Sequence, residues 1–372
     1  MKTPTTSATR PKDDGFFMPP EWCRHARTWT TWPACSDASV NSELKDTLSE
    51  IIQSVREFEP ITVVATKGSY DDVANRCGPK LDIITIPHDS PRIRDTGPTF
   101  LVDGKGGSAA VDWKFNSWGQ NDQGNESDSK LTHTLLGEAE VRRFRAPLTL
   151  ESGIFCSDDN GTLIVSSAAI FDSKRNPNLS RLDAFNILTS WLGVRHVIWC
   201  DQTLGKDVWK SELRRSCVFA RSGHALVGKS SDDDMAGPLD LTAQHLAQSE
   251  DARGARLTVE RIPVVSLPEG IATYTTFYVL NEAVLLPKYG APEDDVALSL
   301  IQPYFAGRKI IQINCIPLLR VNCSLSSLLQ YQPARLLERH KATLLPKSAW
   351  HRPVPDYEGL LDSYIERLEN GD

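Results

Sequence analysis

One local pattern recurs along the 372-residue chain, and it constrains the fold more than any other feature. Each copy contains a β-rich run, a polar loop, a segment with helical spacing and a second β-rich run. In the second copy, Leu182, Phe185, Leu188 and Leu192 recur at the spacing of one helix face, so they should point inward. The four copies span residues 60–87, 161–201, 224–264 and 283–315.

Repeated β-α-β units cannot bury their sheet faces alone, so they are expected to pack together in one α/β domain. A ring of such units would place the helices outside and bring strand ends and loops together at its axis, where a ligand site would lie. We expect residues 1–16 to form a flexible tail and residues 17–372 to form a single domain. The polar segment 116–130 is expected to be a long surface loop.

The charge distribution argues against several classes of partner. The net charge is −7 with a pI near 5.7, and lysines and arginines are scattered, so neither nucleic acid nor an anionic membrane surface is an expected partner. No apolar run approaches the ~20 residues of a spanning helix, and the N-terminal segment lacks the apolar stretch of a secretory signal. The eight cysteines occur singly, which favours a reducing, cytoplasmic setting over a disulfide framework.

One apparent cofactor motif is better explained as a strand. Residues 223–230 match the phosphate-loop pattern GxxxxGK[ST], which requires a loop that opens into a helix. The intervening residues, His-Ala-Leu-Val, are typical of a strand interior, and the acidic segment that follows would repel a phosphate. The sequence also lacks HExxH, EF-hand and paired-cysteine zinc patterns. We therefore predict no nucleotide, no other cofactor and no metal.

Several longer segments together carry a resemblance to a known family. They are MPPEWCRHARTWTTWP (18–33), RDTGPTF (94–100), DWKFNSWG (112–119), LESGIF with DNGTLIVS (150–166), YTTFYVLNEAVLLPKYGAPEDD (274–295) and QPA (332–334). In this order they resemble the agmatine deiminase and Porphyromonas-type peptidylarginine deiminase family. The resemblance implies the pentein fold, a five-bladed α/β propeller built from repeated β-α-β units, with the site on its axis and a possible homodimer.

The family's chemistry requires a planar guanidinium held between carboxylates, which satisfy its N–H groups. A cysteine thiolate attacks the central carbon, and a histidine transfers protons. Two of the four family segments are retained here, because Asp95 lies in Arg-Asp-Thr-Gly-Pro and Glu151 lies in Leu-Glu-Ser-Gly. Just before Asp95, Arg92 replaces a tryptophan that the family places beside the substrate.

The other two segments are changed. Counting back from the FAR segment puts Glu212 at the family's histidine and Arg214 at its paired aspartate. Counting back from QPA puts Ser326 at the second histidine and Ser327 at the nucleophilic cysteine. The glycines upstream of that cysteine become Arg-Val-Asn-Cys, residues 320–323.

These changes argue against deimination by the family mechanism. A serine hydroxyl is far less acidic than a thiol of pKa ~8.5, and it needs a strong base, which Glu212 supplies only if burial raises its pKa. Arg214 would place a fixed positive charge where a guanidinium would lie. A shift of the alignment by four residues leaves Cys323 as an alternative nucleophile.

Each candidate residue also has a plainer interpretation. Arg94 or Arg214 could pair internally with Asp95 or Glu151 instead of binding a ligand. Glu212 could be a general acid or base, or a solvated surface residue. The candidate catalytic residues are Glu212, Asp95, Glu151 and Ser327, and the candidate substrate-binding residues are Arg214, Arg94, Arg92, Trp118, Asn322 and Cys323.

Three functions follow from these observations. The first, which we favour, is a repurposed enzyme whose axial carboxylates carry out acid–base or binding-driven chemistry on a small molecule. The second is a catalytically silent binding protein of the same fold. The third is a residual guanidine hydrolase, acting on agmatine or an arginine derivative, that uses Cys323 or Ser327.

Overall fold

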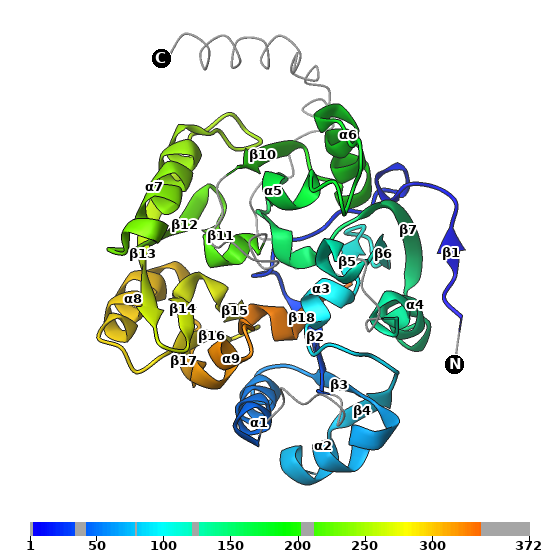
Figure 1. Ribbon diagram of the computed structural model, residues 1–372. Helices are drawn as coiled ribbons and strands as arrows, with labels where there is room; N and C mark the ends of the chain where they lie inside the picture. The colour runs from blue at the N-terminus through cyan, green and yellow to red at the C-terminus, as the bar shows by residue number, and fades with distance from the viewer. Residues whose placement is uncertain (1–2, 34–41, 79, 121–125, 202–211, 336–372) are drawn as a thin grey trace.

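The structure is a computed structural model that describes residues 3–33, 42–78, 80–120, 126–201 and 212–335. Within these residues, five small sheets surround a common axis, and the longer helices lie on the outside (Figure 1). The prediction of an α/β propeller built from repeated β-α-β units is therefore confirmed.

The four copies expected from the sequence each form two parallel strands joined by a helix, one copy to a sheet. Parallel neighbours need such a crossover connection, which explains the recurring order of segments. The copies are β3 (Ile61–Ala65), α2 (Tyr70–Cys77) and β4 (Asp82–Thr85); β9 (Thr162–Ser166), α6 (Arg181–Leu192) and β10 (His196–Cys200); β12 (His224–Lys229), α7 (Asp233–Gln248) and β13 (Thr258–Leu267); and β16 (Ala283–Lys288), α8 (Glu293–Ile301) and β17 (Lys309–Asn314).

A fifth copy was missed by the sequence analysis. It consists of β6 (Ser108–Lys114), α4 (Asp128–Glu138) and β7 (Arg142–Thr149), with β6 and β7 parallel. Part of it had been expected to be a surface loop. The described part of that loop instead forms the short helix η3 (Ser117–Gly119) and the start of α4.

Further elements complete the five sheets and the axis. The strands are β1 (Thr6–Ser7), β2 (His25–Thr31), β5 (Thr99–Val102), β8 (Phe155–Ser157), β11 (Cys217–Arg221), β14 (Gly270–Thr273), β15 (Tyr278–Val279) and β18 (Leu329–Pro333). The helices are η1 (Pro11–Asp14), α1 (Ser42–Arg56), η2 (Lys67–Ser69), α3 (Ile93–Thr96), η4 (Ser152–Ile154), α5 (Ser167–Ile170), η6 (Leu213–Arg215), η7 (Tyr274–Thr276), η8 (Gln302–Phe305), α9 (Ile316–Arg320) and η9 (Ser326–Leu328).

The last described strand closes the ring by joining the first sheet. β18 pairs antiparallel with β2, in the sheet order β18-β2-β3-β4. The indole Nε1 of Trp29 on β2 donates to Gln332 Oε1 on β18 over 3.0 Å, and Thr30 Oγ1 donates to the Leu328 carbonyl over 2.8 Å. Segments about 300 residues apart in the chain therefore form one blade.

Helix α6 corrects one detail of the predicted inward face. Phe185, Leu188 and Leu192 are buried as expected, but Leu182 is 52% exposed. The helix begins where the Ser180 hydroxyl accepts from the Asp183 N–H, so Leu182 lies in its first turn. It is two residues, about half a turn, from the buried Ala184, which places it on the solvent side.

The described part of the expected N-terminal tail is instead packed against the propeller. β1 pairs in parallel with β7, through Thr6 with Arg143 and Ser7 with Phe144. Phe16 is 7% exposed and packs edge-on against the Phe144 ring. This contact buries an aromatic side chain that a free tail would leave in water.

The apparent phosphate loop is a strand, as the sequence analysis anticipated. Residues 224–229 form β12, and α7 begins only at Asp233, beyond an Asp232 N-cap. A Cβ at Gly228 would lie 2.7 Å from Val264 Cγ2, so this glycine permits close packing of the sheet against its neighbours.

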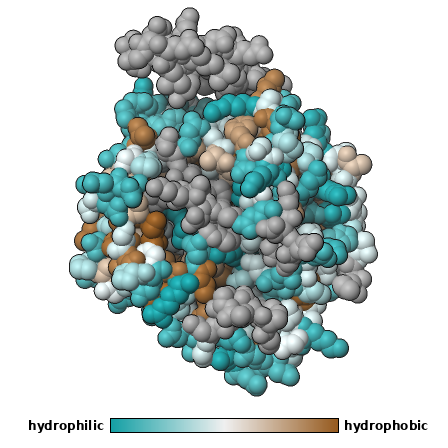
Figure 2. Space-filling view, viewed as in Figure 1, coloured by the Kyte–Doolittle hydropathy of each residue, from teal (hydrophilic) through white to brown (hydrophobic). Residues whose placement is uncertain are grey.

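The face of the molecule in Figure 2 is largely hydrophilic, with separate apolar groups. In the part of the chain that the structure describes, no helix is long and apolar enough to cross a membrane.

Candidate functional site

Four short helices, which lie between strands of different sheets, meet near the axis. The candidate residues lie on these helices or directly before them. Helix α3 contacts η4 and η9, and η4 contacts η6. Asp95 lies on α3, Glu151 directly precedes η4, Glu212 directly precedes η6, and Ser327 lies on η9. Residues from four distant parts of the sequence are thereby brought to one centre.

Asp95 is held in place by an indole on a strained loop. Trp118 Nε1 donates to Asp95 Oδ2 over 3.1 Å. Ser117 and Trp118 have φ angles of 56° and 57°, in the left-handed region that a bulky side chain rarely adopts. Such strain persists only where the surroundings fix it, and it concentrates at functional sites.

Asp95 and Glu212 approach each other across a glycine. A Cβ placed on Gly153 would lie 2.7 Å from Asp95 Oδ1 and 3.8 Å from Glu212 Cγ. The first distance is too short for a real contact and the second is an ordinary one, so a larger residue at this position would displace the Asp95 carboxylate. Gly153 therefore permits two acidic groups to share the centre.

This shared environment changes the acidity of Asp95. Loss of solvent contact, together with the neighbouring Glu212 carboxylate, raises the pKa of Asp95 to about 7, while Arg92 acts in the opposite direction. Among the described residues, Asp95 forms no salt bridge. Its carboxyl group therefore changes charge near neutral pH.

The charge of Glu151, by contrast, is already balanced by an arginine of the same chain. Its side chain is 1% exposed, and Arg175 Nε lies 3.1 and 3.2 Å from its two oxygens. Burial raises the pKa of Glu151, and the Arg175 charge opposes that shift. The sequence analysis did not identify Arg175, because nothing in its local sequence marks it as the partner of a residue 24 positions away.

Glu212 lies inside the site rather than on the solvated surface. Its side chain is 10% exposed, it accepts a hydrogen bond from the Ser324 hydroxyl, and Arg215 Nε lies 3.7 Å from its second oxygen. Ser327, which the resemblance places at the nucleophile, donates its hydroxyl to the Ser324 carbonyl over 2.8 Å. Among the described residues, the hydrogen bonds of the Ser327 hydroxyl are with Ser324 and Cys323, and none is with Glu212.

Cys323 is the thiol that lies at this centre. Its Sγ is 3.1 Å from Ser327 Oγ. Burial raises the pKa of Cys323, Arg92 and the Ser327 hydrogen bond lower it, and the charges of Glu212 and Asp95 raise it further. The thiol is thus close to both carboxylates and is held mainly in its protonated form.

Arg92 acts on the Cys323 thiol through its charge, and Asn322 directly precedes Cys323 in the chain. The Arg92 guanidinium lies 5.8 Å from the centre of the Trp118 ring and donates to the Asn322 and Val321 carbonyls. Asn322 has φ 49°, a left-handed conformation that asparagine adopts more readily than most residues. An asparagine can therefore follow the backbone path at a position where the resemblance places a glycine.

Arg94 and Arg214 do not reach the axial carboxylates, which corrects the sequence interpretation of an Asp95 or Glu151 partner. Both bind Glu21, with Arg94 Nη1 at 2.9 Å and Arg214 Nη1 at 3.1 Å from Glu21 Oε2. Arg214 also donates to the Phe277 carbonyl over 2.8 Å and is 3% exposed. The sequence analysis missed Glu21, although a glutamate within the apolar Met-Pro-Pro-Glu-Trp segment could have indicated a buried partner.

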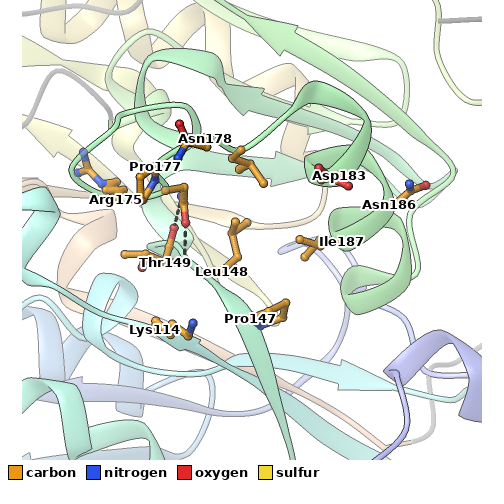
Figure 3. Close-up of a pocket in the computed structure, with 12 residues that line it drawn as sticks. Lys114, Pro147, Leu148, Thr149, Arg175, Pro177, Asn178, Asp183, Asn186 and Ile187 are labelled. Atoms are coloured by element: carbon orange, nitrogen blue, oxygen red, sulfur yellow. Dashed lines mark hydrogen bonds between the residues drawn. The ribbon is translucent and has the colours of Figure 1, made fainter.

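A separate cavity of about 460 Å³ is lined by none of the candidate residues (Figure 3). It lies between the end of β7 and helix α6, with Arg175 and Asn176 among its lining residues. The Asn176 amide bonds the Thr149 N–H and carbonyl, and Arg175 is bound to Glu151, so these polar groups already have structural partners. The described residues contain no group of three or more histidine, cysteine or acidic side chains arranged to hold a metal.

Comparison with known proteins gives a consistent result. Over residues 17–333 the chain matches the family described as Porphyromonas-type peptidyl-arginine deiminase. An agmatine deiminase of Pseudomonas aeruginosa is 28% identical over 367 residues, covering 90% of this chain and 99% of the relative. The solved agmatine deiminase of Enterococcus faecalis has a TM-score of 0.84 at 23% identity, covering 89% of this chain and 100% of that one. An agmatine deiminase of C. jejuni with substrate bound has a TM-score of 0.76 at 22% identity, covering 85% and 96%.

Proposed function

Because this chain belongs to the Porphyromonas-type peptidyl-arginine deiminase family, we propose that its axial site binds a small cationic molecule with a guanidine or amine group. We further propose that acid–base chemistry of the axial carboxylates acts on this molecule, without a covalent intermediate on Ser327. The chain is in this sense a divergent member of a family of guanidine-modifying enzymes.

The proposal rests on which of the buried carboxylates already have a charged partner. Glu21 is bound by Arg94 and Arg214, and Glu151 is bound by Arg175. Asp95 forms no ion pair among the described residues: the Arg92 charge lowers its pKa without a salt bridge, and Trp118 donates to its Oδ2. A cationic group would relieve the repulsion between Asp95 and Glu212, because opposite charges favour the ionised carboxylate.

Arg214 does not oppose a cationic ligand in this arrangement. The sequence suggested that its charge would occupy the guanidinium position, but its guanidinium is bound to Glu21 and the Phe277 carbonyl. Asp95, with a pKa of about 7, is suited to accept or donate a proton at neutral pH. Glu212, held by Ser324, is the second candidate for proton transfer.

The ligand class is tested by calorimetric titration and by thermal shift, since a ligand that binds only the folded state raises the unfolding midpoint. Agmatine, arginine, an arginyl peptide and putrescine represent the cations, and neutral and carboxylate metabolites of similar size serve as controls. We expect only the cations to bind. Stabilisation by anions alone would reject the proposal, and binding of a cation without turnover would favour the silent binding protein.

The affinity for the cation should depend on pH with a defined sign. A cation binds best to ionised Asp95, so its affinity should rise by up to ~10-fold per pH unit as the pH approaches about 7 from below, and should level off above it. Calorimetric titration with agmatine between pH 5.5 and 8.5 measures this profile. A flat profile over this range would show that Asp95 does not hold the ligand.

A second candidate function rests on Cys323, whose sulfur lies 3.1 Å from Ser327 Oγ and near both carboxylates. If this thiol gives its proton to a neighbouring carboxylate and attacks a guanidinium carbon, ammonia leaves and water then cleaves the carbon–sulfur bond, so agmatine or arginine should give a ureido product. Cys323→Ala should lower the rate of formation of this product at least ~10³-fold. Cys156→Ala is the matched control, since Cys156 is also buried and its pKa is raised to about 12. Equal rates in the two variants would exclude this candidate.

A further inference from the structure

A small cavity separate from Asp95 lies among the buried arginines of the core. It has a volume of about 30 Å³, and its lining includes Glu21, Arg94, Arg214 and Gln330. All four side chains are at least nine-tenths buried. A single water needs roughly 10–15 Å³ of such space, so the cavity has room for about two particles of that size.

Three polar atoms on these lining residues have no hydrogen-bond partner within the described structure. They are Arg94 Nη2, Arg214 Nε and Gln330 Oε1. The other polar atoms of the same side chains are engaged, including Arg94 Nε with the Ser326 carbonyl at 2.6 Å and Gln330 Nε2 with the Pro98 carbonyl. Because a buried polar group without a partner is costly, these three atoms indicate an occupant of the cavity.

The charge around the cavity is positive. Arg94 and Arg214 share one carboxylate, Glu21. Burial, together with the proximity of Arg94, lowers the pKa of Arg214 despite the opposing contribution of Glu21.

The other ionisable groups around the cluster do not cancel this charge. Burial raises the pKa of the Cys156 thiol to about 12 and raises those of the Tyr278 and Tyr331 hydroxyls, so all three are neutral at pH 7. His25 and Glu59 form a pair at 3.0 Å, and His25 Nε2 also lies 2.7 Å from the Glu21 carbonyl. Glu212 faces Arg214 from the axial side, where it is bound to Ser324 and Arg215.

We propose that this cavity binds one small monovalent anion of the size of chloride between Arg94 Nη2 and Arg214 Nε. A neighbouring water donates to Gln330 Oε1, since an amide oxygen would repel the anion itself. The two arginines donate, the anion accepts, and the second positive charge gains a partner. The inference does not depend on which ligand the axial site takes.

The position of the anion connects it to the axial site. Arg94 adjoins Asp95 on α3, and Arg214 follows Glu212 by two residues at η6. An anion held by both arginines would join the two segments that carry the axial carboxylates. The site therefore acts as a positioning element for Asp95 and Glu212 and makes no contact with the substrate.

Two measurements test the proposal on the intact protein. In crystals soaked with sodium bromide, we expect an anomalous peak in contact with both arginines. In thermal unfolding at constant ionic strength, replacing gluconate, which is too large for the cavity, with chloride should raise the midpoint by roughly 2–5 °C. A density feature without anomalous signal, together with equal midpoints in the two salts, would mean that water alone fills the cavity and would overturn the proposal.

Matched variants separate this effect from general salt effects. Arg214→Met should abolish the difference between chloride and gluconate, whereas Arg175→Met should keep it, since Arg175 is also buried but is bound to Glu151 and does not line this cavity. Loss of the chloride effect in both variants would contradict the assignment to this cavity. Should Arg214→Met not fold, the bromide measurement on the unmodified chain still decides the question.

Discussion

Replacing Glu21 with glutamine should lower the free energy of unfolding by about 3–5 kcal/mol, because removal of one partner of a buried ion pair leaves the other charge uncompensated. Glu21 is 8% exposed and is the carboxylate that binds both Arg94 and Arg214. It also accepts the Val279 N–H over 3.1 Å. The single oxygen of an amide cannot replace the two charged oxygens of a carboxylate, so both guanidinium groups lose the negative charge that balances them.

Thermal and urea unfolding at pH 7 measure the effect, and the midpoint should fall by roughly 5–10 °C. The control is Glu43→Gln, which removes an exposed pair with Arg320 and should change stability by less than about 1 kcal/mol.

The pKa of Glu21 is lowered in the folded state, where its arginine partners outweigh burial. The stability that Glu21 contributes is therefore present at neutral pH, and it is lost as the pH falls below the ordinary pKa of a glutamate. A loss in Glu21→Gln as small as that expected for Glu43→Gln, below about 1 kcal/mol, would show that the buried cluster does not stabilise the fold.

Replacing Asp95 with asparagine should weaken binding of a cationic ligand by about 10²-fold or more, since truncating a desolvated charge pair costs roughly 2–5 kcal/mol. The change keeps the size of the side chain and an oxygen for the Trp118 N–H. It also removes the repulsion with Glu212, so the free protein should become more stable above pH 7 while its affinity falls. Opposite changes in stability and affinity are expected of a group that serves a ligand.

Glu212→Gln completes this experiment. If Glu212 transfers a proton, the variant should bind the ligand with a modest loss of affinity but should lose turnover. Asp103→Asn is a suitable control, because Asp103 bonds the Lys105 and Gly107 N–H groups of an exposed turn. Unchanged affinity in Asp95→Asn, or full turnover in Glu212→Gln, would remove these residues from the proposed roles.

Much of the fold could be predicted from the sequence because each repeat has a recognisable local order of strand-like and helix-like segments. The apolar runs of β3, β9, β12 and β16 are short and continuous, as expected of strands buried on both faces. The fifth copy was missed because residues between β6 and α4 are polar and include the strained Ser117–Gly119 turn. The packing of β1 on β7 was missed because a strand of two residues carries no periodic signal.

The candidate site was predicted less completely, and the reason is geometric. The retained Asp-x-Gly-Pro and Leu-Glu segments identified Asp95 and Glu151, and both lie at the converging helices. The partners of the charged residues depend on distances between separate blades, which no sequence spacing encodes. Arg214 and Glu21, which are 193 positions apart, illustrate this: the sequence indicated a buried arginine but not the carboxylate that binds it.

The pairing of β18 with β2 has a consequence for how the protein folds. The first blade lacks one of its strands until residues 329–333 have been synthesised, and closing this contact requires a chain loop of about 300 residues. Such long-range pairing is entropically slow and occurs late in folding. Because Cys323 and Ser327 directly precede β18, the axial centre is assembled in the same event. In a refolding time course, ligand binding should therefore appear with the slowest phase, after the helices and the other four sheets have formed.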